Sequence, residues 1–306
     1  MISTAQALGY REDERLLIIN ADDFGLCYSS NEGIRQLLLE GAVSSATIMM
    51  PCNWARDAAL WSARHRHLDI GVHLTFTSEW GAMKWGPVCR HQAVGSLVTD
   101  EGYFPADAKT FERQAVEAEV KAELAAQIEM ALSLGIDVTH VDNHMGSLYG
   151  LKTGRHFLHE VFEVCVEYQL PFRLPRQLVA QNIATAHTEL SVQAQRFAEE
   201  AERRGIVVLD NLQGLPFQGE AGERYEDFKK EMLELIRNLQ PGVTEIIIHP
   251  ALATEELRAF HGAPRRREME MELFRDEEVK QAIADEGIIP VRWRELRELQ
   301  RRRGGM

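Results

Sequence analysis

Residues 16–25 read LLIINADDFG, an aliphatic run that ends in two adjacent carboxylates. The run Leu16–Ala21 is predicted to be a buried strand, because a short apolar stretch bounded by polar residues is typical of a parallel sheet. Packing does not explain Asp22 and Asp23 at its end. Neighbouring strand side chains point to opposite faces, but the chain leaves the strand here, so both carboxylates can face one site. The alternative is that one aspartate caps the next turn while the other is solvated.

Aliphatic runs of this kind alternate with amphipathic helical stretches along the whole chain, which is the pattern of βα units around a parallel sheet. The predicted strands are Leu16–Ala21, Ser45–Met50, Asp69–Thr75, Asp137–Asp142, Pro171–Leu174, Ile206–Asp210, Thr244–His249 and Ile288–Trp293. Eight strands with helices between them predict an α/β fold of the (β/α) barrel type, regular or deformed, with its chemistry at the carboxyl ends of the strands. A doubly wound open sheet is the alternative.

Two helices are predicted with definite boundaries. Asn31 is expected to cap a helix over Glu32–Glu40, with Gly41 in the left-handed position at its carboxyl end. A second helix is expected over Glu112–Leu134, where apolar residues recur every four positions and form one buried stripe.

Residues 78–105 differ from the rest of the chain because they contain tryptophans and glycines without a clear period. They are predicted to form a long loop insertion after the third strand, and long ordered loops are often lids or binding loops. Trp80 and Trp85 can stack on a substrate ring or pack inside the protein, and the sequence leaves both interpretations open.

The 306 residues carry 34 Lys and Arg against 47 Asp and Glu, a formal net charge of −13. Nucleic-acid affinity comes mainly from basic side chains that displace counterions, so this balance argues against DNA, RNA and anionic membranes as partners. The arginine runs at 265–267 and 301–303 are therefore predicted to be solvated helix ends. The length alone leaves open whether the chain forms two domains or one α/β barrel with a single core. With the barrel interpretation, residues 1–306 are expected to be a single domain.

No stretch approaches the roughly 20 apolar residues that cross a bilayer. Residues 1–15 lack the basic and apolar regions of a secretory signal, so a cytoplasmic location is expected. The four cysteines are widely spaced, without a CxxC pair, and are predicted to be reduced thiols. They are Cys27, Cys52, Cys89 and Cys165.

Titratable residues also stand at the ends of three other predicted strands. They are His73 in IGVHLT, His140, Asp142 and His144 in THVDNH, and His249 in IIIHP. Taken alone, each histidine is more often a hydrogen-bonded core residue than a ligand. The alternate spacing of His140, Asp142 and His144 lets their side chains share one face of the strand. Because strand ends converge in a barrel, the whole set predicts one site.

The chemistry of such a site follows from its donor atoms. One carboxylate and two neutral imidazoles can hold a divalent ion and leave positions open for water and substrate. The ion lowers the pKa of its water towards about 7 and polarises a carbonyl, while a nearby unligated carboxylate takes the proton of the water. These residue types therefore predict metal-assisted hydrolysis.

Seven motifs in order make the chain resemble the YdjC-like carbohydrate deacetylases, a family related to the wider polysaccharide deacetylases. The motifs are IINADDFGL at 18–26, NEGI at 31–34, GAVSSATIM at 41–49, IGVHLT at 70–75, THVDNH at 139–144, FRLPRQ at 172–177 and IIIHP at 246–250. The resemblance covers most of the chain, and seven motifs in order are far more specific than any one of them.

The resemblance implies a single divalent ion held by Asp23, His73 and His144. Zinc or magnesium is expected, with manganese, cobalt and iron as the alternatives. Many relatives continue the motif of the fourth strand with further histidines, whereas residues 145–148 read MGSL here. The substrate contacts on that side therefore stay open.

The resemblance also implies the catalytic groups. Asp22 matches the general base, His249 matches the histidine that protonates the leaving amine or assists the oxyanion, and Arg173 matches an arginine that orients the base. Asp142 is interpreted as the hydrogen-bond partner of a ligating imidazole, since such histidines normally donate their other N–H group. His140 is interpreted as a structural residue.

The expected activity is therefore that of a metal-dependent hydrolase that removes an N-acetyl group from an amino sugar or a short oligosaccharide. A sugar isomerase, aldolase or phosphoesterase on the same barrel is one alternative. A carbohydrate-binding protein without catalysis is another. Neither GxGxxG nor GxxxxGK[ST] occurs in the sequence. A homodimer is expected because α/β enzymes of this size are often symmetric dimers.

Overall fold

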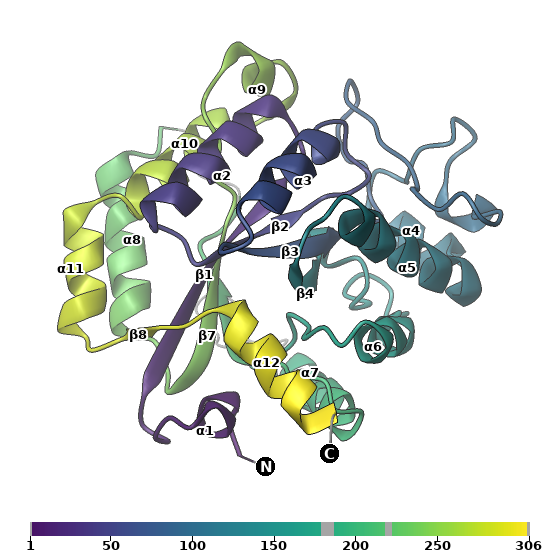
Figure 1. Cartoon of the computed structure of the whole chain (residues 1–306). Coiled ribbons are helices and arrows are strands. Elements are labelled where there is room, and N and C mark those ends of the chain that lie inside the picture. The colour runs from purple at the N-terminus through teal and green to yellow at the C-terminus, as the bar shows by residue number, and fades with distance from the viewer. Residues whose placement is uncertain (1, 179–186, 218–221, 305–306) are drawn as a thin grey trace.

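The protein is built around a parallel β-sheet (Figure 1). The computed structural model describes residues 2–178, 187–217 and 222–304. In this described part, eight strands form one sheet. Seven of them follow the order β4-β3-β2-β1-β7-β6-β5, and the eighth, β8, pairs with β1. The strands are β1 (Arg15–Phe24), β2 (Ser45–Ile48), β3 (Asp69–Leu74), β4 (Val138–Asn143), β5 (Pro175–Leu178), β6 (Leu209–Gly214), β7 (Gly242–Ile248) and β8 (Ile289–Pro290). The predicted α/β fold is confirmed.

Helices surround this sheet, as Figure 1 shows. They are α1 (Thr4–Leu8), α2 (Tyr28–Glu40), α3 (Ala55–Arg64), α4 (Ala108–Gln114), α5 (Glu117–Ser133), α6 (Leu158–Glu167), α7 (His187–Arg203), α8 (Tyr225–Arg237), α9 (Glu255–Phe260), α10 (Pro264–Leu273), α11 (Glu277–Asp285) and α12 (Trp293–Gly304), with short 3-10 turns η1 (Gly95–Leu97) and η2 (His144–Gly146). In Figure 1, α1 and α12 lie at the lower end of the molecule, where both chain termini are found.

The sheet curls until its two edges meet at a single parallel bridge between Val141 and Phe172. The backbone N–H of Arg173 donates to the carbonyl of Val141 at 3.0 Å, and the N–H of Phe172 donates to Val207 on the other side at 3.2 Å. The predicted strand Pro171–Leu174 is therefore this connecting segment, and the regular ladder of β5 begins only after it. The result is the deformed barrel that the strand pattern predicts.

The apolar residues of β1 divide between two hydrophobic clusters because successive side chains of a strand point to opposite faces. Leu17 and Ile19 belong to the large cluster that packs the sheet against the surrounding helices. Leu16 and Ile18 belong to a small cluster with Trp293 of α12. The face of β1 that carries Leu16 and Ile18 is therefore apolar at its amino-terminal end, and the same face continues into polar residues towards its carboxyl end.

The predicted cap of α2 is wrong, because α2 begins at Tyr28 and its capping residue is Cys27. Asn31 lies inside the helix, where its Oδ1 atom accepts a hydrogen bond from the N–H of Gly25 at 2.7 Å. The asparagine thus fixes the turn that follows β1 rather than the start of a helix. The carboxyl end agrees with the prediction, since Gly41 has a φ of 68°.

The predicted helix over Glu112–Leu134 is wrong at its beginning. Ala115 and Val116 have extended backbones, and this break separates α4 from α5. An uninterrupted stripe of apolar residues at four-residue spacing gives no sign of such a break. The stripe is buried only in the middle of α5, where Val120, Leu124 and Ile128 are inaccessible. Its end residues Val116 and Leu132 are exposed, so the prediction of one continuous buried stripe is wrong at both ends.

The predicted insertion after the third strand is confirmed, since the chain between β3 and α4 contains only the short turn η1. Trp85 within it is 3% exposed. Its indole N–H donates to the carbonyl of Thr77 at 2.8 Å. This tryptophan packs inside the protein, which decides between the two interpretations left open for it.

The described residues contain no helix with both the length and the apolar character of a membrane crossing. All four cysteines lie in the described part of the chain as free thiols, in agreement with the prediction.

The interior of the barrel leaves no room for a side chain at Gly71 of β3. A Cβ atom at this position would lie 2.6 Å from Cε1 of His140 and 2.7 Å from its carbonyl oxygen. The imidazole of His140 cannot move aside freely, because it stacks on Trp293 with ring centroids 4.4 Å apart. A Gly71→Ala substitution is expected to lower the free energy of unfolding by about 1–3 kcal/mol through overpacking.

Urea denaturation measures this effect, with Gly81→Ala as the matched control because nothing lies within 4 Å of a Cβ atom there. Equal stability of the two variants would show that the His140 ring moves aside without a loss of folding free energy.

Candidate metal centre and active site

The end of β1 brings two neighbouring carboxylates to the same histidine. Oδ2 of Asp22 lies 3.7 Å from Nε2 of His73, and Oδ1 of Asp23 lies 3.6 Å from the same nitrogen. Asp23 has a φ of 65°, and the strand register shifts between Ala21 and Phe24. A left-handed non-glycine residue costs about 1–3 kcal/mol of backbone strain. This irregularity turns two adjacent side chains towards one site, which a regular strand cannot do.

Three donor atoms converge at this point. Oδ1 of Asp23, Nε2 of His73 and Nδ1 of His144 are separated by 3.6, 3.5 and 3.2 Å. Such separations suit ligands that share one ion at about 2.0–2.2 Å from each. Within the described part of the chain, the buried Oδ1 atom of Asp23 has no hydrogen-bond partner. The three residues could therefore hold a metal ion.

Asp22, His73 and Asp142 form a second group with metal-ligand spacing. Here a cation is already present, because the guanidinium of Arg173 lies 2.6 Å from Oδ1 of Asp22 and 2.7 Å from Oδ2 of Asp142. The charge of Arg173 satisfies these carboxylates. The first group, with its unpartnered oxygen, is the better candidate for an ion.

Each imidazole of the first group has a carboxylate on its outer nitrogen. Nδ1 of His73 lies 2.7 Å from Oδ1 of Asp142, which is the contact that the sequence predicts for Asp142. Nε2 of His144 lies 3.0 Å from Oε1 of Glu79. Burial acts to lower the pKa of His144, but Glu79 and Asp23 outweigh it and raise this pKa to about 10. Without an ion, the His144 imidazole is therefore protonated at neutral pH.

Asp23 has a partner of opposite charge, Arg267 of α10, whose Nη2 donates to Oδ2 of the aspartate at 2.6 Å. The prediction that the run 265–267 is a solvated helix end is wrong, because Arg266 and Arg267 are 5% and 8% exposed. A run of three arginines on a helix places some of them on its inner face, where each needs a buried acceptor. Burial acts to raise the pKa of Asp23, but Arg267 and the neighbouring histidines hold it well below its ordinary value.

Arg173 contacts three buried carboxylates at once, namely Asp22, Asp142 and Glu245. Its two terminal nitrogens donate to the two oxygens of Asp22 at 2.7 and 2.6 Å. Burial acts to raise the pKa of Asp22, but Arg173 and His73 pull it below its ordinary value. Burial, together with Asp22 and Asp142, raises the pKa of Glu245 to about 8 against the charge of Arg173. At neutral pH, Asp22 is therefore ionised.

His249 directly follows β7 and lies beside Asp22. Its Nε2 lies 4.0 Å from Oδ2 of Asp22, and its backbone N–H donates to Oε2 of Glu270 at 2.6 Å. The ring of Phe217 packs against it edge-on, with centroids 4.8 Å apart. Burial lowers the pKa of His249 to about 4, against the raising effect of the aspartates. The His249 imidazole is neutral at neutral pH.

His140 lies apart from the donor atoms, as its structural interpretation predicts. Its Nδ1 is 2.9 Å from the hydroxyl of Thr139, and its ring is stacked on Trp293. Burial and the charge of Arg173 hold the pKa of His140 well below its ordinary value. A neutral ring packed on an indole fits the interior of the barrel.

Three charged residues of this site are not among those predicted from the sequence, namely Glu79, Arg267 and Glu245. Glu79 stands in an aperiodic insertion and Arg267 in an arginine run, so nothing in the sequence marks either one. Glu245 does carry a signal. It interrupts an aliphatic strand four residues before His249, and the two-residue period of a strand places both side chains on one face.

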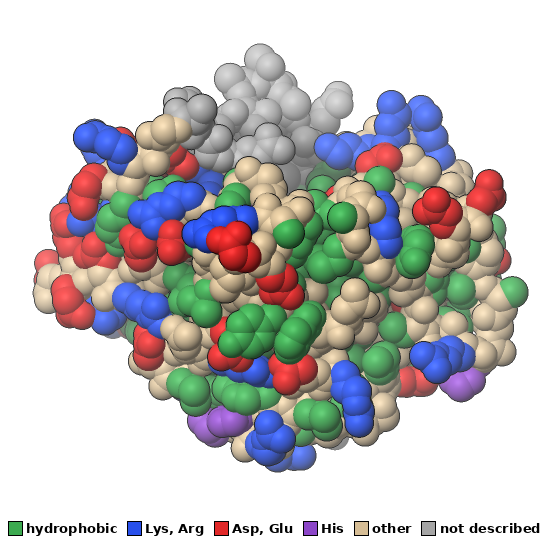
Figure 2. Space-filling model, turned by 90° about the horizontal axis from the view of Figure 1, so that it is seen from above, with side chains coloured by type: hydrophobic (Ala, Val, Ile, Leu, Met, Phe, Trp, Pro, Cys, Tyr) green, Lys and Arg blue, Asp and Glu red, His purple; other side chains and the backbone are tan. Residues whose placement is uncertain are grey.

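Figure 2 shows the molecule from above, where acidic and basic side chains interleave around apolar ones. Trp80 of the insertion packs against Phe260 and His261, with ring centroids 5.1 and 5.5 Å away.

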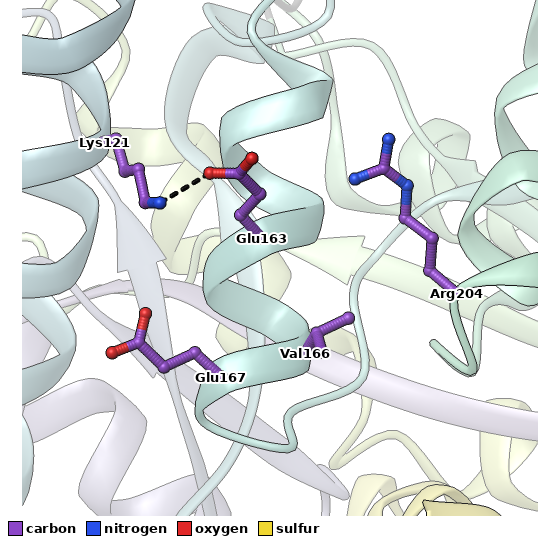
Figure 3. A pocket seen from close by; sticks show the side chains of 5 residues that line it. All are labelled: Lys121, Glu163, Val166, Glu167 and Arg204. Carbon is purple, nitrogen blue, oxygen red and sulfur yellow. Dashed lines mark ion pairs between the residues drawn. The ribbon is translucent and has the colours of Figure 1, made fainter.

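A surface pocket lies elsewhere, on the outer side of α5 and α6 (Figure 3). It is lined by Lys121, Glu163, Val166, Glu167 and Arg204. The ion pair between Lys121 and Glu163 measures 2.6 Å, but both side chains are more than a third exposed. Exposed pairs of this kind contribute about 0–1 kcal/mol to stability. The pocket has none of the buried donor atoms of the strand ends, and we do not regard it as the active site.

The protein is an α/β barrel with a candidate metal centre. Its sheet is parallel and curled, and buried carboxylates and imidazoles lie at the carboxyl ends of the strands. A family model described as YdjC-like protein matches residues 16–285. The chain belongs to the YdjC-like family, and the resemblance seen in the sequence motifs is confirmed.

Curated relatives match the chain over almost its whole length. A protein of Thermus thermophilus named carbohydrate deacetylase is 30% identical over 93% of this chain and 94% of its own. Another carbohydrate deacetylase, from Thermoanaerobacter pseudethanolicus, is 28% identical over 90% of this chain and 96% of its own. Among solved structures, an Enterococcus faecalis protein named a cellobiose-phosphate cleavage protein superimposes with a TM-score of 0.72 at 28% identity, covering 92% of this chain and 99% of that chain.

Removal of the guanidinium from Arg173 would leave its three carboxylates buried without a cation. An Arg173→Met substitution is expected to lower the free energy of unfolding by about 3–5 kcal/mol, because breaking a buried ion pair exposes the full cost of burying its charge. Urea denaturation of the ion-free protein at neutral pH measures this loss.

The control is Arg301→Met on the exposed end of α12, which is expected to stay within about 0.5 kcal/mol of the unsubstituted protein. An Arg173→Met protein as stable as this control would contradict the role of Arg173 as the counter-charge of the barrel interior.

Proposed function

We propose that the protein is a metal-dependent carbohydrate deacetylase, which hydrolyses the N-acetyl group of an amino sugar or a short oligosaccharide. One observation carries this proposal: the unpartnered Oδ1 atom of Asp23 faces two imidazole nitrogens beside an ionised, arginine-held Asp22. The carbohydrate deacetylases among its relatives support the same activity.

Asp23, His73 and His144 would hold the ion. One carboxylate and two imidazoles suit zinc, cobalt, manganese or iron, while magnesium prefers oxygen ligands. A divalent ion supplies two effects in such a site, because it polarises a carbonyl oxygen and lowers the pKa of a water molecule. Asp142 and Glu79 fix the orientation of the two imidazoles through their outer nitrogens.

Asp22 is the general base in this proposal. Its Oδ2 atom faces Nε2 of His73 at 3.7 Å and Nε2 of His249 at 4.0 Å, so a proton taken from water would be accepted at this oxygen. Arg173 holds the carboxylate by both oxygens and keeps it ionised. A fixed orientation and a fixed charge state are what a positioned base requires.

His249 completes the set as the group that protonates the leaving amine. Because its imidazole is neutral at neutral pH, Nε2 must first receive a proton before it can donate one. Its position 4.0 Å from Oδ2 of Asp22 places the acceptor and the later donor on the same small site. The homodimer, the cytoplasmic location and the single domain stay predictions.

An Asp22→Asn protein is expected to lose acetate release from N-acetylglucosamine oligosaccharides by about 10²- to 10⁴-fold, because the amide cannot accept the proton of the water. Its ion content is expected to remain one per chain, since Asp22 is not one of the proposed ligands. Acetate is measured enzymatically and the ion by elemental analysis, with the exposed Asp100→Asn as the control. Full turnover in the Asp22→Asn protein would refute the base assignment.

Ion binding is expected to release a proton at about pH 7 and to strengthen as the pH rises towards 9, since a ligating histidine must be neutral. The sign follows from His144, whose pKa of about 10 in the ion-free protein leaves it protonated below that pH.

Calorimetric titration with Co²⁺ in buffers of different ionisation enthalpy measures the protons released. Heats that do not depend on the buffer would show that His144 is already neutral, and a His144→Ala protein is expected to bind no Co²⁺ at all.

A further inference from the structure

The insertion after β3 reaches the candidate metal centre through two consecutive residues. The first is Glu79, whose carboxylate oxygens lie 3.0 and 3.2 Å from Nε2 of His144. The opposite nitrogen of the same ring, Nδ1, faces Oδ1 of Asp23 at 3.5 Å and Nε2 of His73 at 3.2 Å. Glu79 therefore contacts the outer side of an imidazole whose inner side belongs to the donor group.

The second residue is Trp80, which reaches the site through His261. Its indole packs on His261, whose Nε2 accepts a hydrogen bond from Nε of Arg267 at 2.9 Å. Arg267 in turn donates to Oδ2 of Asp23 at 2.6 Å. Two adjacent residues of the insertion thus connect to two of the three proposed ligands, Glu79 directly and Trp80 through two intermediate residues.

The carboxylate of Glu79 has a specific effect on the His144 ring. A neutral imidazole carries one N–H donor and one acceptor nitrogen, and the partner of the donor decides which is which. With Glu79 accepting from Nε2–H, the lone pair is on Nδ1, the nitrogen that faces the other donors. The Glu79 side chain is 18% exposed, so solvent competes little for this contact.

The His144 ring needs the contact with Glu79 because the backbone beside it is irregular. The next residue, Met145, has a φ of 55°, so β4 ends abruptly in a left-handed turn. His144 is the first residue of η2, immediately after β4, so no strand pairing holds it and the orientation of its ring depends on side-chain partners.

We propose that Glu79 is a positioning residue of the metal centre, which orients His144 and thereby couples ion binding to the insertion at residues 78–105. This inference rests on the proposed function, because His144 is a ligand only under that proposal. Coupling is reciprocal: if the insertion stabilises the ligand geometry, a bound ion must stabilise the insertion by the same free energy.

The first test compares the Co²⁺ affinity of the unsubstituted protein, Glu79→Gln, Glu79→Asp and Glu101→Gln, by competition with a chromophoric chelator. Glu101 is an exposed glutamate of the same insertion and serves as the matched control. Loss of the partner of a ligating histidine typically weakens metal binding about 10- to 100-fold, which is the change expected for Glu79→Gln. Glu79→Asp keeps the charge and is expected to bind Co²⁺ more tightly than Glu79→Gln, while Glu101→Gln stays unchanged.

The second test measures hydrogen exchange of residues 78–105 with and without Co²⁺, at saturation in each protein. Co²⁺ is expected to slow exchange in the unsubstituted protein and in Glu101→Gln, and to have little effect in Glu79→Gln. A merely structural role of Glu79 would change exchange equally with and without the ion.

The outcomes separate the two proposals. If the unsubstituted protein binds no Co²⁺, the proposed function itself fails. If it binds one ion and Glu79→Gln binds as tightly, the metal centre stands and the positioning role of Glu79 is refuted. An ion-dependent slowing of exchange that persists in Glu79→Gln would refute the coupling in the same way.

Discussion

The contact of one guanidinium with three buried carboxylates is the constraint on which the rest of the site depends. Arg173 is the cation for Asp22, Asp142 and Glu245 together, so one positive charge faces three acidic groups. Burial of unpaired charge is costly, and this cost raises the pKa of Glu245 to about 8. The negative charge that remains beside the donor atoms is the electrostatic reason why a dication suits this position.

The same interior explains how a packed barrel can contain a polar site. Along β1, one face carries Leu16 and Ile18 and then Asn20 and Asp22, all of them buried. The apolar half packs with Trp293 of α12, and the polar half satisfies its groups by mutual contacts such as that between Asn20 Nδ2 and Asp22 Oδ1 at 2.8 Å. Stability and chemistry therefore occupy opposite ends of the same strands.

The strands that carry the site can be predicted, because the two-residue period of a strand does not depend on distant contacts. The convergence of strand ends in a barrel then predicts that Asp22, His73, His144 and His249 lie together. Glu79 was not predictable, since its position depends on the path of an aperiodic loop. The prediction that Arg267 is solvated is wrong for a related reason. Its burial depends on the carboxylate of Asp23 on β1, which is far away in the sequence. The break before α5 could not be predicted either, because it does not disturb the four-residue spacing of apolar residues.

The bridge that closes the barrel has a consequence for how the chain folds. Val141 and Phe172 form the bridge, and their neighbours Asp142 and Arg173 form an ion pair at 2.7 Å. Desolvating Asp142 before Arg173 arrives would bury an unpaired charge, which is strongly unfavourable. We therefore expect barrel closure and charge pairing to occur as one cooperative event, so that the closed barrel and the oriented base form in the same step.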